Sequence, residues 1–296
     1  MEAVQKPWKI LELLKTTEEL FKKYSIENPR LNAELLLAGT LNTERIKLYL
    51  DFEKPLTDNE LAEFRNKVKR RLNYEPVQYI LGEAYFFGRK FKVNPSVLIP
   101  RPETELLVEK TIEKAKGNNL SNPAILEIGA GSGCISISVA GSIDCHIDAI
   151  ELNDDAILTA QENSELNGVS DKICFKRSDF LNENINIDNY DIVISNPPYI
   201  AKDDVNQLPD EIKNFEPHLS LTDCSDGLEF YRRIFELYNS AIKKPFILLE
   251  IGDGKKTAVE RLINNYTIKN YTIHKDLLNI YRVLEFKNDS VNTKST

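Results

Sequence analysis

The sequence predicts an α/β domain with a mostly parallel sheet, preceded by a small all-α domain and a β-hairpin linker. Two observations lead to this fold class. Apolar residues follow a helical period up to about residue 83, whereas helical and strand patterns alternate from residue 104 onward. Such alternation is typical of parallel strands with helices on both faces. The predicted domains are 1–83 (helical), 84–99 (hairpin) and 100–296 (α/β).

The helical part has its clearest helix at residues 58–73, with Asp58 as the expected N-cap. Its apolar residues recur at spacings of three and four and so share one face: Leu61, Phe64, Val68 and Leu72. Its basic residues are Arg65, Lys67, Lys69, Arg70 and Arg71. Because they lie mostly off the apolar face, we expect a solvated surface, with a partner-docking patch as the alternative. Further helices are expected at 8–24 and 30–41.

The rest of the chain reads as a hairpin followed by alternating elements. Tyr85–Phe87 and Lys90–Val93 flank Gly88 and Arg89 as the strands of a hairpin would. The helices expected after it are 104–116, 133–141, 154–167, 226–242 and 254–265. The strands expected are 124–128, 146–151, 173–178, 190–195, 245–251, 270–275 and 281–287. The tail KNDSVNTKST is expected to be disordered.

Composition excludes several classes of protein. The 296 residues contain 38 basic and 46 acidic side chains, a net charge of −8, which argues against a surface built to bind nucleic acid. No apolar run approaches the ~18 residues of a membrane span, and the start MEAVQKPWKI does not resemble a secretion signal. We therefore expect a cytoplasmic protein without membrane contact. Four cysteines without a CxxC pair and three scattered histidines predict no metal site.

A glycine-rich segment predicts a nucleoside cofactor. AILEIGAGSGCISIS places Gly129, Gly131 and Gly133 where the first strand of the α/β domain meets a helix, so that backbone can approach a ligand closely. A dinucleotide fingerprint would be GxGxxG, but Cys134 stands in place of its third glycine. Glu151, about twenty residues on at the next strand end, is positioned to bind ribose hydroxyls. The alternative is an ordinary strand-to-helix turn.

The segment YDIVISNPPYI predicts a rigid, acceptor-rich loop. The strand stops at Pro197 and Pro198, which have no N–H and restrict the residues before them. Asn196 adds a side-chain carbonyl, and Tyr199 adds a flat aromatic face. Such a loop suits a planar NH₂ group, and the alternative is a rigid turn with a core tyrosine. In a doubly wound sheet the first and fourth strands are neighbours, so this loop and the glycine loop should meet.

These motifs resemble class I S-adenosylmethionine-dependent methyltransferases that act on planar amino groups. The segments EPVQYILG, NPSVLIPRPETELLVE, VISNPPYI and FEPHLSLTDCSDGLEFYRRI resemble, more narrowly, the release factor glutamine methyltransferase family of protein-(glutamine-N5) methyltransferases. The resemblance covers about residues 5–288. It implies a seven-stranded, Rossmann-like class I methyltransferase domain behind a helical substrate-recognition domain.

The resemblance also implies an activity and its residues. A methyl group would pass from S-adenosylmethionine, leaving S-adenosylhomocysteine, to the glutamine amide nitrogen of the Gly-Gly-Gln motif of class I peptide chain release factors. The implied cofactor-binding residues are Gly129, Ala130, Gly131, Ser132, Gly133, Glu151, Asp179, Phe180 and Asn196. The implied catalytic and substrate-binding residues are Asn196, Pro197, Pro198 and Tyr199. A ring at Phe180, where some members have tryptophan, can still pack on adenine.

Several questions stay open at the level of sequence. Arg101 and Glu103 fit either a stiffened helix N-terminus or a direct role in the active site. The same loop chemistry would serve a ribosomal-protein glutamine or a nucleic-acid adenine, although base capture usually needs a basic groove. A nicotinamide-dependent oxidoreductase, or a nucleotide-binding module without chemistry, is disfavoured by Cys134. We expect a monomer that makes no direct contact with nucleic acid.

Overall fold

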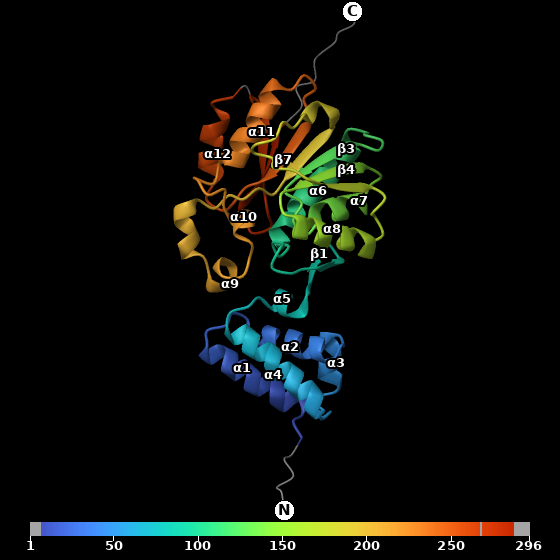
Figure 1. Ribbon diagram of the computed structural model, residues 1–296, viewed down its shortest axis with the longest axis vertical. Helices are drawn as coiled ribbons and strands as arrows, with labels where there is room; N and C mark the ends of the chain where they lie inside the picture. Colours follow the sequence, from blue (N-terminus) through green and yellow to red (C-terminus); the bar gives the residue numbers. More distant parts are fainter. Residues whose placement is uncertain (1–6, 267, 287–296) are drawn as a thin grey trace, which may run out of the picture. The chain divides into compact units, whose positions relative to one another are not determined.

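The computed structural model describes residues 7–266 and 268–286, in two compact units (Figure 1). The first unit consists of Met1–Gly82 together with Pro209–Phe215, and the second consists of Glu83–Leu208 together with Glu216–Thr296. The tail expected to be disordered lies outside the described residues. Within the described residues, no helix is long and apolar enough to cross a membrane.

The first unit is helical. Its elements are α1 (Ile10–Lys23), α2 (Pro29–Thr40), α3 (Arg45–Leu50), α4 (Asp58–Leu72), α5 (Val77–Leu81) and α9 (Asp210–Lys213). The N-cap of α4 is Thr57, so the expectation of Asp58 was wrong by one residue. The Thr57 hydroxyl accepts from the Glu60 N–H, and the Glu60 carboxylate accepts from the Thr57 N–H at 2.7 Å. This reciprocal capping box satisfies two N–H groups at once.

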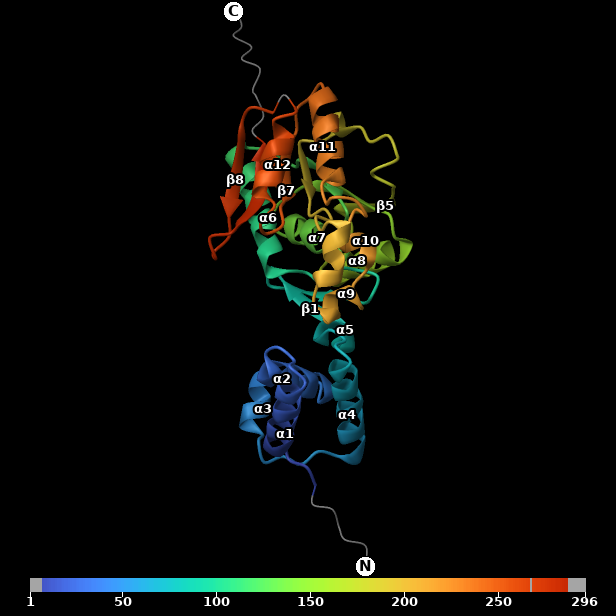
Figure 2. The same cartoon turned by 90° about the vertical axis from the view of Figure 1, so that its left-hand side faces the viewer.

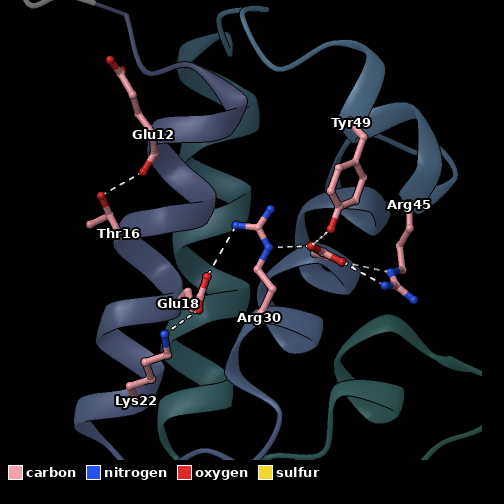
Figure 3. Close-up of polar contacts among 8 residues, drawn as sticks. Glu12, Thr16, Glu18, Lys22, Arg30, Arg45 and Tyr49 are labelled. Carbon is pink, nitrogen blue, oxygen red and sulfur yellow. Dashed lines mark hydrogen bonds and ion pairs between the residues drawn. The ribbon is translucent and has the colours of Figure 1, made fainter.

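A buried carboxylate fixes α3 against α2 (Figure 3). Glu34 of α2 is 1% exposed and accepts from Arg30 Nε at 2.6 Å and from Arg45 Nη2 at 2.9 Å. The Tyr49 hydroxyl donates to the same carboxylate. A buried charge costs little only when it is paired and hydrogen-bonded, and these donors meet that requirement. The short helix α3 is therefore tied to α2 by its polar residues.

The basic face of α4 differs most from the expectation at Arg71. Arg65 and Lys69 are exposed, as expected for a solvated surface, but Arg71 is only 4% exposed. Its guanidinium donates to Asn32 Oδ1 at 2.8 Å and to Glu211 Oε2 at 2.6 Å. The expectation of solvent exposure was therefore wrong for Arg71, because segment Pro209–Phe215 supplies a carboxylate that the local sequence of α4 cannot reveal.

The second unit is a seven-stranded sheet with the order β5-β4-β3-β6-β7-β9-β8. Its strands are β3 (Ala124–Ile128), β4 (His146–Glu151), β5 (Ile173–Arg177), β6 (Ile192–Ser195), β7 (Phe246–Glu250), β8 (Tyr271–Lys275) and β9 (Tyr281–Phe286). Neighbouring strands are parallel except that β9 runs antiparallel to β7 and β8. The predicted seven-stranded, Rossmann-like sheet is confirmed.

Helices cover both faces of this sheet (Figure 2). The helices of the second unit are α6 (Glu105–Gly117), α7 (Cys134–Ala140), α8 (Asp154–Leu166), α10 (His218–Leu221), α11 (Glu229–Ser240) and α12 (Lys256–Ile263). One apolar core contains residues of α6 and α7, and the other contains residues of α11 and α12. The core strands are apolar on both faces, which is why they read as continuous hydrophobic runs.

The hairpin consists of β1 (Glu83–Phe86) and β2 (Arg89–Lys92) in antiparallel register. The turn residues are Phe87 and Gly88, with φ of 49° and 69°. The expected turn at Gly88 and Arg89 was therefore wrong by one residue. A two-residue turn with positive φ at both positions matches the twist of the strands, and here Phe87 accepts that conformation.

Candidate active site

A cavity of about 380 Å³ lies at the carboxyl ends of β3, β4 and β6. This volume falls in the ~300–1,000 Å³ range of small-molecule sites. Residues from each of the sequence motifs line it: Gly129, Ala130, Gly131, Ser132, Glu151, Asp179, Phe180, Asn196 and Pro198. Strands β3 and β6 are hydrogen-bonded neighbours, with Ile128 paired with Ser195, so the predicted meeting of the two loops is confirmed.

The glycines of the loop after β3 have two different functions. Gly129 and Gly131 have φ of 80° and 53°, and a Cβ at either would meet no atom within 4 Å. Gly133, which is not among the lining residues, is the N-cap of α7. A Cβ there would lie 2.9 Å from Ile137 Cδ1 and 3.2 Å from Ala160 Cβ. The first two glycines therefore leave the cavity open, while Gly133 permits close packing of α7.

The carboxylate of Glu151 is held at the end of β4 by backbone N–H groups. It accepts from Gly131 at 3.0 Å, from Leu152 at 2.8 Å and from Asn153 at 3.0 Å. These bonds fix the carboxylate at the cavity and tie the glycine loop to β4. Oε1 accepts from both Leu152 and Asn153, whereas Oε2 accepts from Gly131, so Oε2 retains capacity for a hydroxyl group of a ligand.

One wall of the cavity is aromatic. Phe180 is 5% exposed and stacks on Phe230, with ring centroids 5.8 Å apart and an interplanar angle of 20°. Both rings line the cavity beside Asp179. Together the flat apolar face and the nearby carboxylate suit a planar heterocycle with polar edges. The sequence contains no local signal for Phe230, because its ring arrives from α11.

A buried carboxyl lies under the glycine loop. Glu127 of β3 is fully buried and accepts from the N–H of Ser136, at 3.2 Å, and from the Ser136 hydroxyl. Burial raises the pKa of Glu127 to about 8, against the opposing effect of the Ser136 bonds. At neutral pH the group is therefore mostly protonated, and it links β3 to the first turn of α7 without placing a charge below the cavity.

The NPPY loop is held by close contacts on two sides. The Ser195 hydroxyl donates to the Ile128 carbonyl at 2.7 Å, which fixes the loop to the end of β3. Asn196 and Pro198 line the cavity, whereas Pro197 and Tyr199 are not among its lining residues. A Cβ at Gly252 would lie 2.5 Å from Tyr199 Cδ2, so the ring of Tyr199 packs directly against that backbone.

The loop around Asp223 supports the other side of the NPPY segment. The Asp223 carboxylate accepts from the backbone N–H of Ser225, Gly227 and Glu229 at 2.8, 3.0 and 2.9 Å. Gly227 has φ of 81°, and a Cβ there would collide with the Tyr199 carbonyl oxygen. One carboxylate and one glycine thus give this loop a defined shape, although the segment LTDCSD itself contains no glycine.

Comparisons with known proteins match the whole arrangement. The PrmC N-terminal domain family model matches residues 12–82, and the Methyltransferase small domain family model matches residues 102–212. A release factor glutamine methyltransferase of Chlorobaculum tepidum is 41% identical over 251 residues, covering 82% of this chain and 85% of the relative. The chain belongs to the release factor glutamine methyltransferase family. It is accordingly an S-adenosylmethionine-dependent methyltransferase.

Further relatives agree with this assignment. The Geobacter sulfurreducens release factor glutamine methyltransferase is 38% identical, covering 85% of this chain and 87% of the relative. The Thermodesulfovibrio yellowstonii relative is 35% identical over 283 residues, covering 93% and 97%. Among solved structures, the hMettl16 catalytic domain in complex with a 3′UTR hairpin has a TM-score of 0.55 at 19% identity, covering 78% of this chain and 82% of that one. This last likeness shows the fold alone.

The methyltransferase also has polar residues behind the NPPY loop that sequence reasoning did not select. Asn196 Nδ2 donates to Thr104 Oγ1 at 3.2 Å. Thr104 is 2% exposed, and Glu250, at the end of β7, is 1% exposed. Burial raises the pKa of Glu250 to about 7, while the Thr104 hydroxyl opposes that shift. The sequence did contain a signal for Glu250, because it is an acidic residue at the carboxyl end of the strand that follows the NPPY strand.

The structure also places Arg101, whose role the sequence left open. Arg101 lines the cavity and its Nη2 donates to Glu216 Oε1 at 2.6 Å. This ion pair joins the segment before α6 to the segment that carries Pro217 and His218, two further lining residues. Glu103 acts at a distance, because its charge contributes to the raised pKa values of Glu250 and Tyr199.

Proposed function

We propose that this enzyme transfers a methyl group from S-adenosylmethionine to the side-chain amide nitrogen of the glutamine in the Gly-Gly-Gln motif of class I peptide chain release factors. The observation that carries the proposal is Asn196, which lines the cofactor-sized cavity with its Nδ2 occupied by Thr104. Its Oδ1 is thereby free to accept from a planar NH₂ group. The relatives' name supplies the substrate class.

The cavity residues fit the cofactor. Glu151 would bind the ribose hydroxyls, Asp179 and Phe180 would bind the adenine, and the open backbone at Gly129 and Gly131 would lie against the methionine part. S-adenosylmethionine supplies a methyl group on a positively charged sulfur, which an uncharged nitrogen can attack. Ala130, Ser132 and Gly133 would complete the glycine loop, with Gly133 acting through the close packing of α7.

The NPPY loop would activate the glutamine by orientation. An amide nitrogen is a poor nucleophile because its lone pair is delocalised into the carbonyl, and its deprotonation at pH 7 is prohibitive. If Asn196 Oδ1 and the Pro197 carbonyl each accept one N–H, electron density at nitrogen rises and its lone pair faces the methyl group. Pro198 and Tyr199 would fix the loop. After transfer the methylated nitrogen loses its surplus proton to solvent water, so a strong base is unnecessary.

The partner and location follow from the same proposal. The helical unit would contact the body of the release factor, and the enzyme would act as a monomer in the cytoplasm. A nucleic-acid adenine is a second candidate acceptor for the same loop, but the net charge of −8 does not favour binding to phosphates. A ribosomal-protein glutamine is the third.

The test is transfer of labelled methyl from S-adenosylmethionine to purified release factor. Parallel reactions contain a release factor with its Gly-Gly-Gln glutamine replaced, a ribosomal-protein fraction, DNA and RNA. Label on the wild-type release factor alone is the expected result. Asn196→Ala should reduce turnover by about 10²-fold or more, because a preorganised polar partner is lost, while cofactor affinity changes less. Unchanged turnover would remove Asn196 from this role.

A further inference from the structure

A chain of buried polar groups extends from the cavity into the protein behind Asn196. Asn196 and Thr104 line the cavity, whereas Glu250 ends β7, is not a lining residue and is close enough to Thr104 for that hydroxyl to lower its pKa. Thr104 stands at the N-cap position of α6, yet its side chain makes no capping hydrogen bond to that helix. The backbone of Thr104 is helical, with φ of −69° and ψ of −18°, because a 3₁₀ turn at Pro102–Thr104 leads directly into α6. Here the hydroxyl is directed to Asn196 instead.

The donor and acceptor directions of the hydrogen bonds among these three residues decide which way the Asn196 amide faces. The Asn196 amide can face the cavity with either Oδ1 or Nδ2, and only Oδ1 can accept from a substrate NH₂ group. A hydroxyl has one proton, so Thr104 can accept from Asn196 Nδ2 while it donates to a second acceptor. The carboxyl oxygens of Glu250 are buried and make no hydrogen bond of ordinary geometry among the described residues. The Thr104 hydroxyl stabilises their charged form.

We infer that Thr104 and Glu250 are positioning residues, which fix the Asn196 side-chain amide with Oδ1 toward the nitrogen that receives the methyl group. The inference rests on the proposed function for its activity test but not for its structural test. In this arrangement the Thr104 hydroxyl would donate a hydrogen bond to the Glu250 carboxylate while it accepts one from Asn196 Nδ2, which leaves Oδ1 facing the substrate. These three residues orient the substrate and transfer no proton to or from it.

The directions of the hydrogen bonds among Glu250, Thr104 and Asn196 depend on pH, because the surroundings of Glu250 shift its pKa. Burial raises its pKa to about 7, so both forms are present near neutrality. When protonated, Glu250 can donate to Thr104, which is then free to donate to Asn196 Oδ1 and reverse the amide. The charged and titratable groups that act on Glu250 or feel its charge are Glu103, Arg101, Arg282, Tyr199, Tyr231 and Cys134. The productive orientation is therefore favoured as pH rises through this range.

The activity test compares Thr104→Val with Thr104→Ser. Valine keeps the shape without the hydroxyl, whereas serine keeps the hydroxyl. We expect Thr104→Val to lower kcat for release factor methylation by about tenfold or more, with cofactor affinity within about twofold, and Thr104→Ser to restore most of kcat. In the wild type, kcat should rise with pH through about 7, and this step should disappear in Glu250→Gln. Equal kcat for both threonine variants would overturn the inference.

A second test needs no substrate. The side-chain NH₂ signals of Asn196 can be assigned in a ¹H–¹⁵N spectrum by their disappearance in Asn196→Asp. We expect them to titrate with an apparent pKa near 7 in the wild type and not in Glu250→Gln, and to shift in Thr104→Val. A wild-type enzyme that methylates no release factor would contradict the proposed function while this readout still tests the orientation. Asn196 NH₂ signals that are the same in the wild type, in Glu250→Gln and in Thr104→Val would overturn the inference itself.

Discussion

The ring of Tyr199 lies against Gly252, where no side chain can be added without moving the ring. A Cβ at that position would come within 2.7 Å of Tyr199 Cε2 as well as 2.5 Å of Cδ2. Tyr199 in turn follows the two prolines that stiffen the loop, so a displaced ring displaces Asn196. The position of the NPPY loop therefore depends on Gly252, which follows β7 in the chain.

Replacing Gly252 with alanine should impair methyl transfer more than cofactor binding. A shift of the NPPY loop by a fraction of an ångström misplaces the acceptor nitrogen, and we expect kcat to fall by about tenfold or more. S-adenosylmethionine affinity, measured by calorimetry, should stay within about threefold. Gly117→Ala is the matched control, because a Cβ at Gly117 meets no atom within 4 Å. Equal turnover in the two variants would show that the ring tolerates displacement.

The residues that sequence reasoning selected are those whose chemistry is carried by local patterns. Gly129, Glu151 and Asn196 each stand at a strand end, and the topology of a doubly wound sheet is sufficient to bring such positions together. Thr104 and Glu250 escaped prediction because their contacts join segments far apart in the chain. Nothing near Thr104 indicates that its hydroxyl faces Asn196 rather than its own helix.

At the scale of elements, α6 is fastened to the antiparallel edge of the sheet through one carboxylate. Glu285 of β9 contacts His274 Nε2 of β8 at 2.9 Å and Lys114 Nζ of α6 at 2.5 Å. Burial opposes ionisation, but these two bonds hold the pKa of Glu285 at about 2, against an ordinary value of 4.5. The ionised form is therefore stabilised by the folded state.

The pH dependence of stability follows from this shift. A carboxyl whose pKa is lowered on folding stabilises the fold above its unfolded value, and the contribution is lost as pH falls from about 4.5 to about 2. Glu285→Gln should lower the free energy of unfolding by on the order of 2 kcal/mol at pH 7, and the difference should vanish in acid. Urea titrations at several pH values measure it. Glu113→Gln on the exposed side of α6 should change stability little.

Long elements were predictable where a periodic pattern ran for several turns, as in α4 and α11. The short helices α3, α5 and α9 were not predicted, because a helix of one or two turns shows less than a full hydrophobic period and is stabilised by tertiary contacts. Helix α3 illustrates the point: its position depends on the Glu34 carboxylate of another helix. The hairpin turn was predicted one residue too late, because Phe87 rather than Arg89 adopts the positive φ that a two-residue turn requires.

At the scale of the whole molecule, the helical unit is discontinuous in sequence. Segment Pro209–Phe215, which follows the NPPY strand along the chain, belongs to the same unit as the N-terminal helices. Its Glu211 pairs with the buried Arg71, whose other partners are Asn32 Oδ1 and the Glu75 carbonyl at 3.1 Å. The folding of the helical unit is therefore completed only when residues from the second half of the chain are present.

Glu211→Gln should consequently loosen the helical unit without loosening the sheet. Removing the partly exposed carboxylate leaves the buried Arg71 charge uncompensated, and because Arg71 keeps two neutral acceptors we expect a loss of about 1–2 kcal/mol. Hydrogen exchange should show faster opening of amides in α2 and α4, while amides of β3 and β6 keep their protection. Glu63→Gln, which breaks an exposed pair with Lys67 on α4, is the matched control and should leave both sets unchanged. Equal acceleration in both units would mean that the chain unfolds as one cooperative body, whereas no acceleration in Glu211→Gln would show that the neutral acceptors alone suffice for Arg71.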